Sequence, residues 1–128
     1  MGKPGTVLFV DDDPYVRKIL GDYLQNAGLK VLSATNGEEA LAVARNFAGD
    51  IQVLISDVMM PGMSGPELAR ELTQSRPGMK VLLISASAGL TPTPGEGWQF
   101  LRKPFPAQVL LEKIREMCQT EGAGGAPG

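Results

Sequence analysis

Residues 51–57 read Ile-Gln-Val-Leu-Ile-Ser-Asp and are followed at once by Val-Met-Met-Pro-Gly at residues 58–62. A short, mostly apolar run that ends before a Pro-Gly turn predicts a buried β-strand over 51–56. Asp57 then lies at the carboxyl end of that strand. Open α/β sheets bind their ligands at this position, so the Asp57 carboxylate is the first candidate functional group of the chain.

Other apolar runs along the chain also lead into polar side chains. They are Thr6–Val10 before Asp11 and Asp12, Val81–Ile84 before Ser85, and Gln99–Leu101 before Lys103. Amphipathic helical patterns alternate with these runs, which predicts βα units and a mostly parallel sheet. The carboxyl ends of parallel strands meet at one edge of a sheet. We therefore expect all of these polar groups to converge there.

The helices have recognisable start signals. Asp13 is a plausible N-cap with Pro14 at the first helical position, and this makes Asp13 a better helix cap than metal ligand. Asn36 and Ser64 each precede a glutamate by three residues, which predicts two further helices with capping boxes. A last helix is expected to begin near Pro106. The expected apolar face of the first helix is Val16, Ile19, Leu20, Tyr23, Leu24 and Ala27.

One helix is missing from the pattern, between Ser85 and Lys103. Pro92 and Pro94 remove backbone donors there, and three glycines weaken any remaining helix. The sequence predicts a loop or at most one helical turn over residues 86–98. The fourth helix of the fold is therefore expected to be shortened or absent.

Length and charge fit one domain of common size. The chain has 128 residues and a formal net charge of -2, without a basic footprint for nucleic acid or a run long enough to span a membrane. We place the domain at residues 6–119, after an extension at 1–5 and before a flexible Gly/Ala-rich tail at 120–128. Because the first residues lack the apolar region of a signal peptide, we expect a cytoplasmic protein.

The sequence contains no histidine and a single cysteine, Cys118. This composition excludes zinc sites built on imidazole or on paired cysteines, as well as Ser/His/Asp and Cys/His nucleophiles. The chain also lacks a Gly-rich nucleotide loop ending in Gly-Lys. Any phosphoryl group that it handles must therefore arrive from another molecule.

Grouped carboxylates suggest the chemistry of the site. Asp11, Asp12 and Asp57 would repel one another unless a cation compensates, and their oxygens suit Mg²⁺, with Mn²⁺ as the alternative ion. An Asp57 oxygen could then attack an incoming phosphoryl group and form an acyl phosphate. Lys103 and the Ser85 hydroxyl could stabilise charge on the phosphoryl oxygens.

Four ordered motifs resemble the receiver domain of two-component response regulators. They are Val10-Asp11-Asp12-Asp13-Pro14, Ser56-Asp57-Val58-Met59-Met60-Pro61-Gly62-Met63-Ser64-Gly65, Ile84-Ser85-Ala86 and Lys103-Pro104-Phe105. The resemblance covers the chain from about Thr6 to Gln119. It implies a flavodoxin-like, five-stranded parallel sheet of order 2-1-3-4-5. It also implies a phosphorelay in which Asp57 accepts phosphate from a histidine kinase or a histidine phosphotransfer protein.

The resemblance also assigns roles to individual residues. It implies a metal site formed by Asp11, Asp12, Asp57 and the backbone carbonyl of Met59. Ser85 matches the switch hydroxyl, Lys103 the phosphate-binding lysine and Phe100 the aromatic switch position, and the Lys103–Pro104 bond would be cis. The broken segment resembles receivers of hybrid sensor kinases. The chain is expected to be a stand-alone receiver, a relay or a piece of such a kinase, and to stay monomeric.

Two other classes of function remain open from the residues alone. The Asp-x-Asp of Asp11 and Asp13 resembles the nucleophile loop of haloacid dehalogenase-type phosphatases, with Asp11 as nucleophile and Asp13 as acid. That enzyme class leaves Asp57 without a role. A degenerate receiver that works through protein contacts would lack a site residue, and none of the expected residues is missing. We therefore expect a signalling phosphoacceptor rather than an enzyme.

Overall fold

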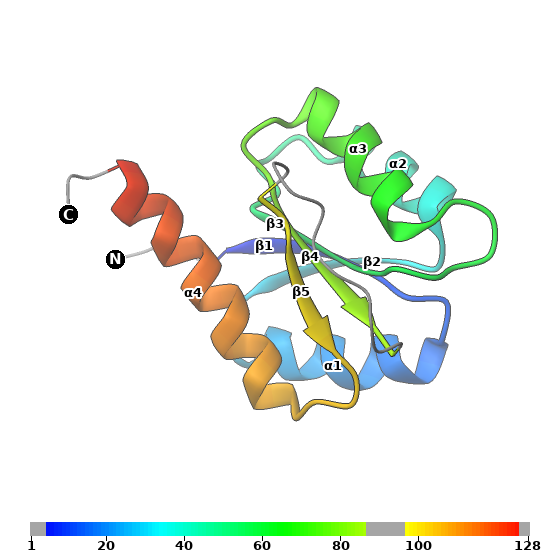
Figure 1. Cartoon of the computed structure of the whole chain (residues 1–128), viewed down its shortest axis with the longest axis horizontal. Coiled ribbons are helices and arrows are strands. Elements are labelled where there is room, and N and C mark those ends of the chain that lie inside the picture. The colour runs from blue at the N-terminus through cyan, green and yellow to red at the C-terminus, as the bar shows by residue number, and fades with distance from the viewer. Residues whose placement is uncertain (1–4, 87–96, 126–128) are drawn as a thin grey trace.

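Five parallel strands form one sheet in the computed structural model of the chain, which describes residues 5–86 and 97–125 (Figure 1). The strands are β1 (Thr6–Val10), β2 (Lys30–Ala34), β3 (Val53–Asp57), β4 (Lys80–Ser85) and β5 (Gln99–Arg102). Their order in the sheet is β2-β1-β3-β4-β5. The predicted order is confirmed, and β3 occupies the centre of the sheet, where all five of its residues are buried.

Helices cover both faces of this sheet. They are α1 (Pro14–Asn26), α2 (Gly37–Asn46), α3 (Gly65–Ser75) and α4 (Ala107–Gly125). Figure 1 shows α2 and α3 on one face and α1 and α4 on the other. Successive strand residues point to opposite faces, so Leu54 packs in the core under α2 and α3 while Ile55 packs in the core under α1 and α4.

Two of the predicted helix starts have the expected bonds. The Asp13 carboxylate accepts from the backbone N–H of Tyr15 at 2.9 Å. Ser64 and Glu67 form a complete capping box, in which the Ser64 hydroxyl accepts from the Glu67 N–H at 3.2 Å and the Glu67 carboxylate accepts from the Ser64 N–H at 2.9 Å. These caps fix the loops that follow β1 and β3.

The start of α2 differs from a capping box in one bond. Asn36 accepts from the Glu39 N–H at 2.8 Å, as predicted. The Glu39 carboxylate, however, accepts from the backbone N–H and the hydroxyl of Thr35. Thr35 offers two donors one residue before the cap, and together they hold the carboxylate more firmly than a single N–H of Asn36 would.

Fewer apolar residues of α1 are buried than the helical pattern predicted. Leu24 is fully buried, whereas Ile19 and Tyr23 are exposed. The sheet is covered on this side by α4 as well as α1, so only part of the apolar stripe of α1 finds a packing partner. Tyr15 is also exposed, and it is one turn before Ile19.

The last helix extends beyond the domain boundary expected from the sequence. Its backbone is helical as far as Gly125, and the expected flexibility of residues 120–128 stays a prediction. Glycine weakens a helix by about 1 kcal/mol per residue without forbidding it. The predicted broken helix falls mostly on residues 87–96, which, like 1–4 and 126–128, lie outside the described residues. Among the described residues, no helix is long and apolar enough to cross a membrane.

The amino-terminal edge of the sheet is held by Arg76, the C-cap of α3. Its guanidinium donates to the backbone carbonyls of Ala44, Phe47 and Gly49 at 2.8–2.9 Å. These bonds satisfy carbonyls at and beyond the end of α2, where a helix leaves acceptors unpaired. Arg76 thereby joins α2 and α3 at the edge opposite the candidate site.

Candidate functional site

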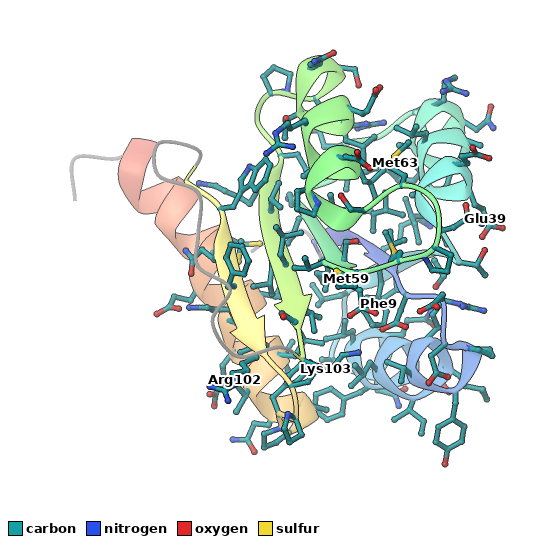
Figure 2. All side chains as sticks on the ribbon, turned by 45° about the vertical axis from the view of Figure 1, so that its right-hand side comes forward. Phe9, Glu39, Met59, Met63, Arg102 and Lys103 are labelled. Carbon is teal, nitrogen blue, oxygen red and sulfur yellow. The ribbon has the colours of Figure 1, made fainter. Side chains whose placement is uncertain are left out.

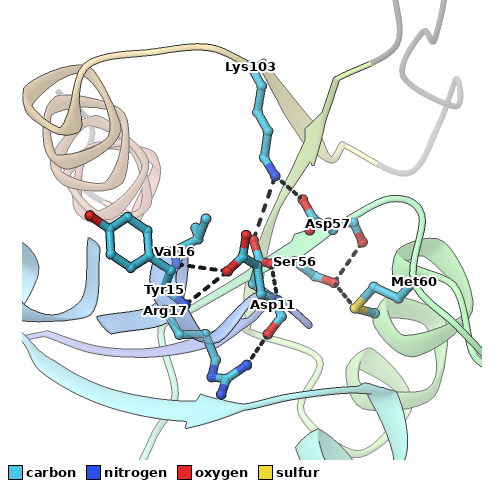
Figure 3. Close-up of polar contacts among 9 residues, drawn as sticks. Asp11, Tyr15, Val16, Arg17, Ser56, Asp57, Met60 and Lys103 are labelled. Atoms are coloured by element: carbon cyan, nitrogen blue, oxygen red, sulfur yellow. Dashed lines mark hydrogen bonds and ion pairs between the residues drawn. The ribbon is translucent and has the colours of Figure 1, made fainter. Parts of the chain in front are cut away.

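The polar groups singled out in the sequence lie at the carboxyl edge of the sheet. Asp57 is the last residue of β3 and Ser85 the last of β4, while Asp11 directly follows β1 and Lys103 directly follows β5. The Lys103 N–H donates to the Ser85 carbonyl at 2.8 Å, which ties the ends of β4 and β5 together. Figure 3 shows Lys103 reaching toward Asp57 and Asp11.

Three carboxylates form the centre of the site. One oxygen from each of Asp11, Asp12 and Asp57 lies within 4.8 Å of the others. Asp11 and Asp57 are buried and Asp12 is exposed, so the cluster opens to solvent on one side. A group of hard oxygen donors with one open side fits a divalent cation of the magnesium type.

Asp13, the third acidic residue in the run after β1, points elsewhere. Its carboxylate caps α1, and its backbone N–H donates to the Asp11 carboxylate at 2.9 Å. The Asp11 N–H in turn donates to the Ala34 carbonyl at 3.2 Å, beside the end of β2. The first bond orients the Asp11 carboxylate, and the second fixes the Asp11 backbone. Asp13 thus serves as a helix cap, as its sequence context predicted.

Lys103 supplies positive charge to the cluster. Its ammonium lies 3.2 Å from Asp57 Oδ1 and 3.7 Å from Asp11 Oδ2, and its side chain is about two-thirds buried. The Lys103–Pro104 peptide bond, which the resemblance implied to be cis, is cis in the structure. One cation therefore faces three carboxylates, which leaves the site rich in negative charge.

Charge and burial shift the pKa values of the two central groups. The pKa of Asp57 is raised to about 6, chiefly by burial and then by the neighbouring charge of Asp11, against the opposing effect of Lys103. Burial alone would lower the pKa of Lys103, but the Asp57 and Asp11 carboxylates outweigh it and raise that pKa. Lys103 stays protonated, and Asp57 is about half ionised near pH 6 and becomes fully ionised only well above it.

The backbone around Asp57 is closely packed. The Val58 N–H donates to the Ile84 carbonyl at 2.8 Å, and the Gly65 N–H donates to the Val58 carbonyl at 2.9 Å. A Cβ on Gly65 would collide with the Asp57 carbonyl, so only glycine fits there. Sequence reasoning quoted Gly65 within a motif but assigned it no role. Its position directly after the N-cap Ser64 was the available signal.

The loop after Asp57 contacts α2. Met63 packs on the first turn of α2, and a Cβ on Gly37 would come within 2.8 Å of its side chain. Met59, expected to provide a backbone carbonyl to a metal, lies in the same loop with its side chain 74% exposed (Figure 2). The loop is thus held at Met63 and Gly65, while Met59 faces solvent.

Phe100 lies away from the carboxylates. It pairs with Leu83 of β4 and packs, half-buried, against the core under α2 and α3. Trp98, directly before β5, packs on the same core, and the Arg70 guanidinium of α3 lies over its ring at 5.6 Å. The predicted aromatic switch position therefore borders α3.

Arg17 is a second residue that sequence reasoning missed. It lies on α1, and its guanidinium donates to the Asp11 carbonyl at 2.6 Å (Figure 3). A single arginine in an amphipathic helix carries no sequence signal for such a contact. The contact became visible only when α1 was placed against the end of β1.

A five-stranded parallel sheet with a carboxylate cluster and a lysine at its carboxyl edge defines a class of signalling domain. Residues 7–115 match the family described as the response regulator receiver domain, and the chain belongs to this family. It is therefore a receiver domain of two-component signalling. Receiver domains act as switches rather than as classical enzymes.

Relatives from several bacteria share this domain. The chain is 34% identical to the probable transcriptional regulatory protein TcrX of Mycobacterium tuberculosis, over 94% of this chain and 53% of that protein. It is 36% identical to the sensor kinase CckA of Brucella abortus, over 91% of this chain and 13% of that protein. The chain thus spans about half or less of the length of these relatives.

Solved structures agree with the fold. The receiver domain of the hybrid histidine kinase CckA matches with a TM-score of 0.72 and 37% identity, over 88% of this chain and 98% of that one. The response regulator TrrA of Thermotoga maritima, solved in complex with Mg²⁺-BeF, matches with a TM-score of 0.75 and 32% identity, over 88% and 98%. TrrA has also been solved in complex with the histidine kinase ThkA.

Proposed function

We propose that Asp57 is the phosphoacceptor of this receiver and takes a phosphoryl group from a phosphohistidine of a partner protein. The observation that carries this proposal is the position of Asp57 between two other carboxylates, which lie within 4.8 Å, and the Lys103 ammonium at 3.2 Å. In the transfer, an Asp57 oxygen forms a bond to phosphorus and the phosphorus–nitrogen bond to the donor histidine breaks. The imidazole leaves as a neutral group after taking up a proton.

Magnesium is the proposed cofactor, with Mn²⁺ as an alternative. The residues that would hold it are the carboxylates of Asp11, Asp12 and Asp57 and the backbone carbonyl of Met59. The clustered oxygens support this assignment, and so does the raised pKa of Asp57, which burial causes first and the negative charge of Asp11 second. When bound, the metal would neutralise the cluster and draw charge from one phosphoryl oxygen.

Two other groups would stabilise the transferred phosphoryl group. Lys103 is protonated and lies beside the Asp57 oxygen that would carry it, so its ammonium can pair with a second phosphoryl oxygen. Ser85 ends the strand next to Asp57 and would donate its hydroxyl to a third. Preorganised donors of this kind lower the barrier without further rearrangement.

The proposed donor is the phosphohistidine of a histidine kinase or a histidine phosphotransfer protein, because residues 1–128 contain no histidine. The kinase complex of TrrA supports a partner of this class. The exposed side chains of Tyr15, Ile19 and Tyr23 follow one another at four-residue intervals along α1, beginning beside the acidic turn. A row of large apolar groups at the mouth of the site is suited to contact with the donor.

The phosphoryl group would act as a switch. Its charge would draw Ser85 toward Asp57, and Phe100 would move inward, which shifts an existing equilibrium between two conformations. We propose that residues 6–119 carry this function in the cytoplasm, as a monomer and without nucleic-acid binding. Sedimentation of the beryllofluoride-treated protein tests the oligomeric state, and a tight dimer would contradict it.

Phosphorylation with acetyl phosphate and Mg²⁺, followed by mass spectrometry of the peptides, tests the assignment directly. Label is expected on Asp57, absent in Asp57→Asn and unchanged in the matched variant Asp22→Asn, whose carboxylate lies exposed on α1. Label on Asp11, or steady turnover of phosphate esters, would favour a haloacid dehalogenase-type phosphatase. Absence of label together with absence of metal binding would favour a degenerate receiver.

The switch can be followed through Trp98, the single tryptophan of the chain. Trp98 shares its core with Phe100, so a movement of Phe100 should change the tryptophan fluorescence. We expect this change on addition of beryllofluoride and Mg²⁺ to the wild type, and a smaller change in Ser85→Ala. A signal of equal size in Asp57→Asn would contradict the proposed switch.

A further inference from the structure

Arg17 joins α1 to the acidic turn that follows β1. Its Nη1 donates to the Asp11 carbonyl at 2.6 Å, and its own backbone N–H donates to the Asp13 carbonyl at 3.0 Å. The Asp11 carbonyl belongs to the peptide unit that connects Asp11 to Asp12. Arg17 therefore holds the unit that sets the direction of both side chains relative to each other.

Arg17 brings positive charge to the site through a bond to a backbone carbonyl and not through an ion pair with a carboxylate of the cluster. The described bond goes to a carbonyl oxygen, so the guanidinium leaves the oxygens of Asp11 and Asp12 available to a cation. Lys103, in contrast, lies on the carboxylates of Asp11 and Asp57 themselves. The two cations thus have different roles: Lys103 pairs with the carboxylates of Asp11 and Asp57, and Arg17 binds the backbone of the acidic turn after β1.

The charge of Arg17 is also felt at the start of α2. It is one of the influences that lower the pKa of Glu39, after the hydrogen bonds from Thr35. Thr35 follows Ala34, whose carbonyl accepts from the Asp11 N–H at 3.2 Å. Asp11 is therefore held at its N–H by the end of β2 and at its carbonyl by Arg17 of α1.

We infer that Arg17 is a positioning residue for the metal, one that fixes the Asp11–Asp12 peptide so that both carboxylates face Asp57. This inference rests on the proposed function, because it concerns the affinity of the same cluster for Mg²⁺. Groups that orient metal ligands typically change metal affinity roughly 10- to 100-fold when they are removed. Arg17 should have an effect of this size although it contacts neither metal nor phosphate.

Calorimetric titration with Mg²⁺ alone, at a pH above 7, tests the inference. Arg17→Met removes the guanidinium but keeps most of the apolar stem, and it is expected to raise the dissociation constant roughly 10- to 100-fold. Arg17→Lys keeps one donor and the charge, so its rise should be smaller. The neighbouring Lys18→Met is the matched control and should bind as the wild type does, since Lys18 pairs only with the exposed Asp22 among the described residues.

A second readout separates positioning from a general structural role. The Mg²⁺ concentration that half-saturates labelling by acetyl phosphate should rise in Arg17→Met, while the rate at saturating Mg²⁺ should return to that of the wild type. An equal loss of rate at every Mg²⁺ concentration would overturn the inference. So would wild-type affinity in Arg17→Met, or in Arg17→Lys if the methionine variant does not fold.

The controls separate failure of this inference from failure of the proposed function. If the wild type and Lys18→Met bind Mg²⁺ and become labelled while Arg17→Met is unaffected, only the role of Arg17 is wrong. If the wild type itself neither binds Mg²⁺ nor becomes labelled, the proposed function is wrong, and the inference fails with it.

Discussion

Replacing Asp57 by asparagine should stabilise the metal-free protein. Asparagine has nearly the shape of aspartate but no charge, so it resembles the protonated form of the residue. In the folded protein the pKa of Asp57 is raised from 3.8 to about 6 by burial and by Asp11. The ionised carboxylate is therefore less favourable in the folded state than in the unfolded state, and its removal relieves that cost.

The size of the effect follows from the pKa difference. Well above pH 6 the Asp57 carboxylate is ionised in both the folded and the unfolded state, and there a shift of about two pKa units corresponds to about 3 kcal/mol of unfolding free energy. Below the unfolded pKa both states are protonated and the cost vanishes. Wild-type stability should thus rise as the pH falls through 6 toward 4, and the advantage of the variant should shrink to about 1 kcal/mol near pH 4.5.

Urea unfolding in the presence of a chelator measures this difference. The variant is expected to be more stable than the wild type by about 3 kcal/mol near pH 7.5, and Mg²⁺ should reduce the gap by stabilising the wild type. Asp22→Asn is the control, because its exposed pair with Lys18 is worth at most about 1 kcal/mol. A variant less stable than the wild type near pH 7.5, or a gap that does not change with pH, would refute the reasoning.

Three further outcomes are expected. Gly65→Ala should lower the unfolding free energy by about 1–3 kcal/mol, because the added Cβ collides with the Asp57 carbonyl. Gly78→Ala, whose Cβ meets no atom within 4 Å, should leave the unfolding free energy unchanged in the same urea titration. Equal effects of the two substitutions would contradict the packing argument. Arg76→Ala should cost about 1–3 kcal/mol by removing three hydrogen bonds to backbone carbonyls, yet label on Asp57 should form at the wild-type rate. Slower labelling would show that the amino-terminal edge of the sheet affects the site. Thermal stabilisation by Mg²⁺ should be large near pH 7.5 and fade below pH 6, where Asp57 takes up a proton, and a stabilisation independent of pH would count against Asp57 as a ligand.

The convergence of the site could be predicted because it depends on the ends of strands. Each apolar run leads into a polar residue, and a parallel sheet brings those ends to one edge. Asp11, Asp57, Ser85 and Lys103 are found there in the structure. The caps at Asp13 and Ser64 were predictable for a similar reason, since each depends on residues only two or three positions apart.

Contacts between separate helices and strands could not be predicted from the sequence. The bond from Arg17 to the Asp11 carbonyl depends on how α1 leaves the end of β1. The exposure of Ile19 and Tyr23 depends on how much of the sheet α4 covers. Helical periodicity reports that a residue shares a face with apolar neighbours, but it does not report whether another element packs against that part of the face.

The contact between Met63 and Gly37 bears on how a signal could leave this domain. The loop that carries Asp57 continues through Met63, and Met63 lies against the first turn of α2 where a side chain at position 37 would leave it no room. A shift of that loop toward α2 would therefore have to be shared with α2. An effector that recognises the outer surface of α2 could therefore distinguish the two states of the domain without touching β5 or the residues around it.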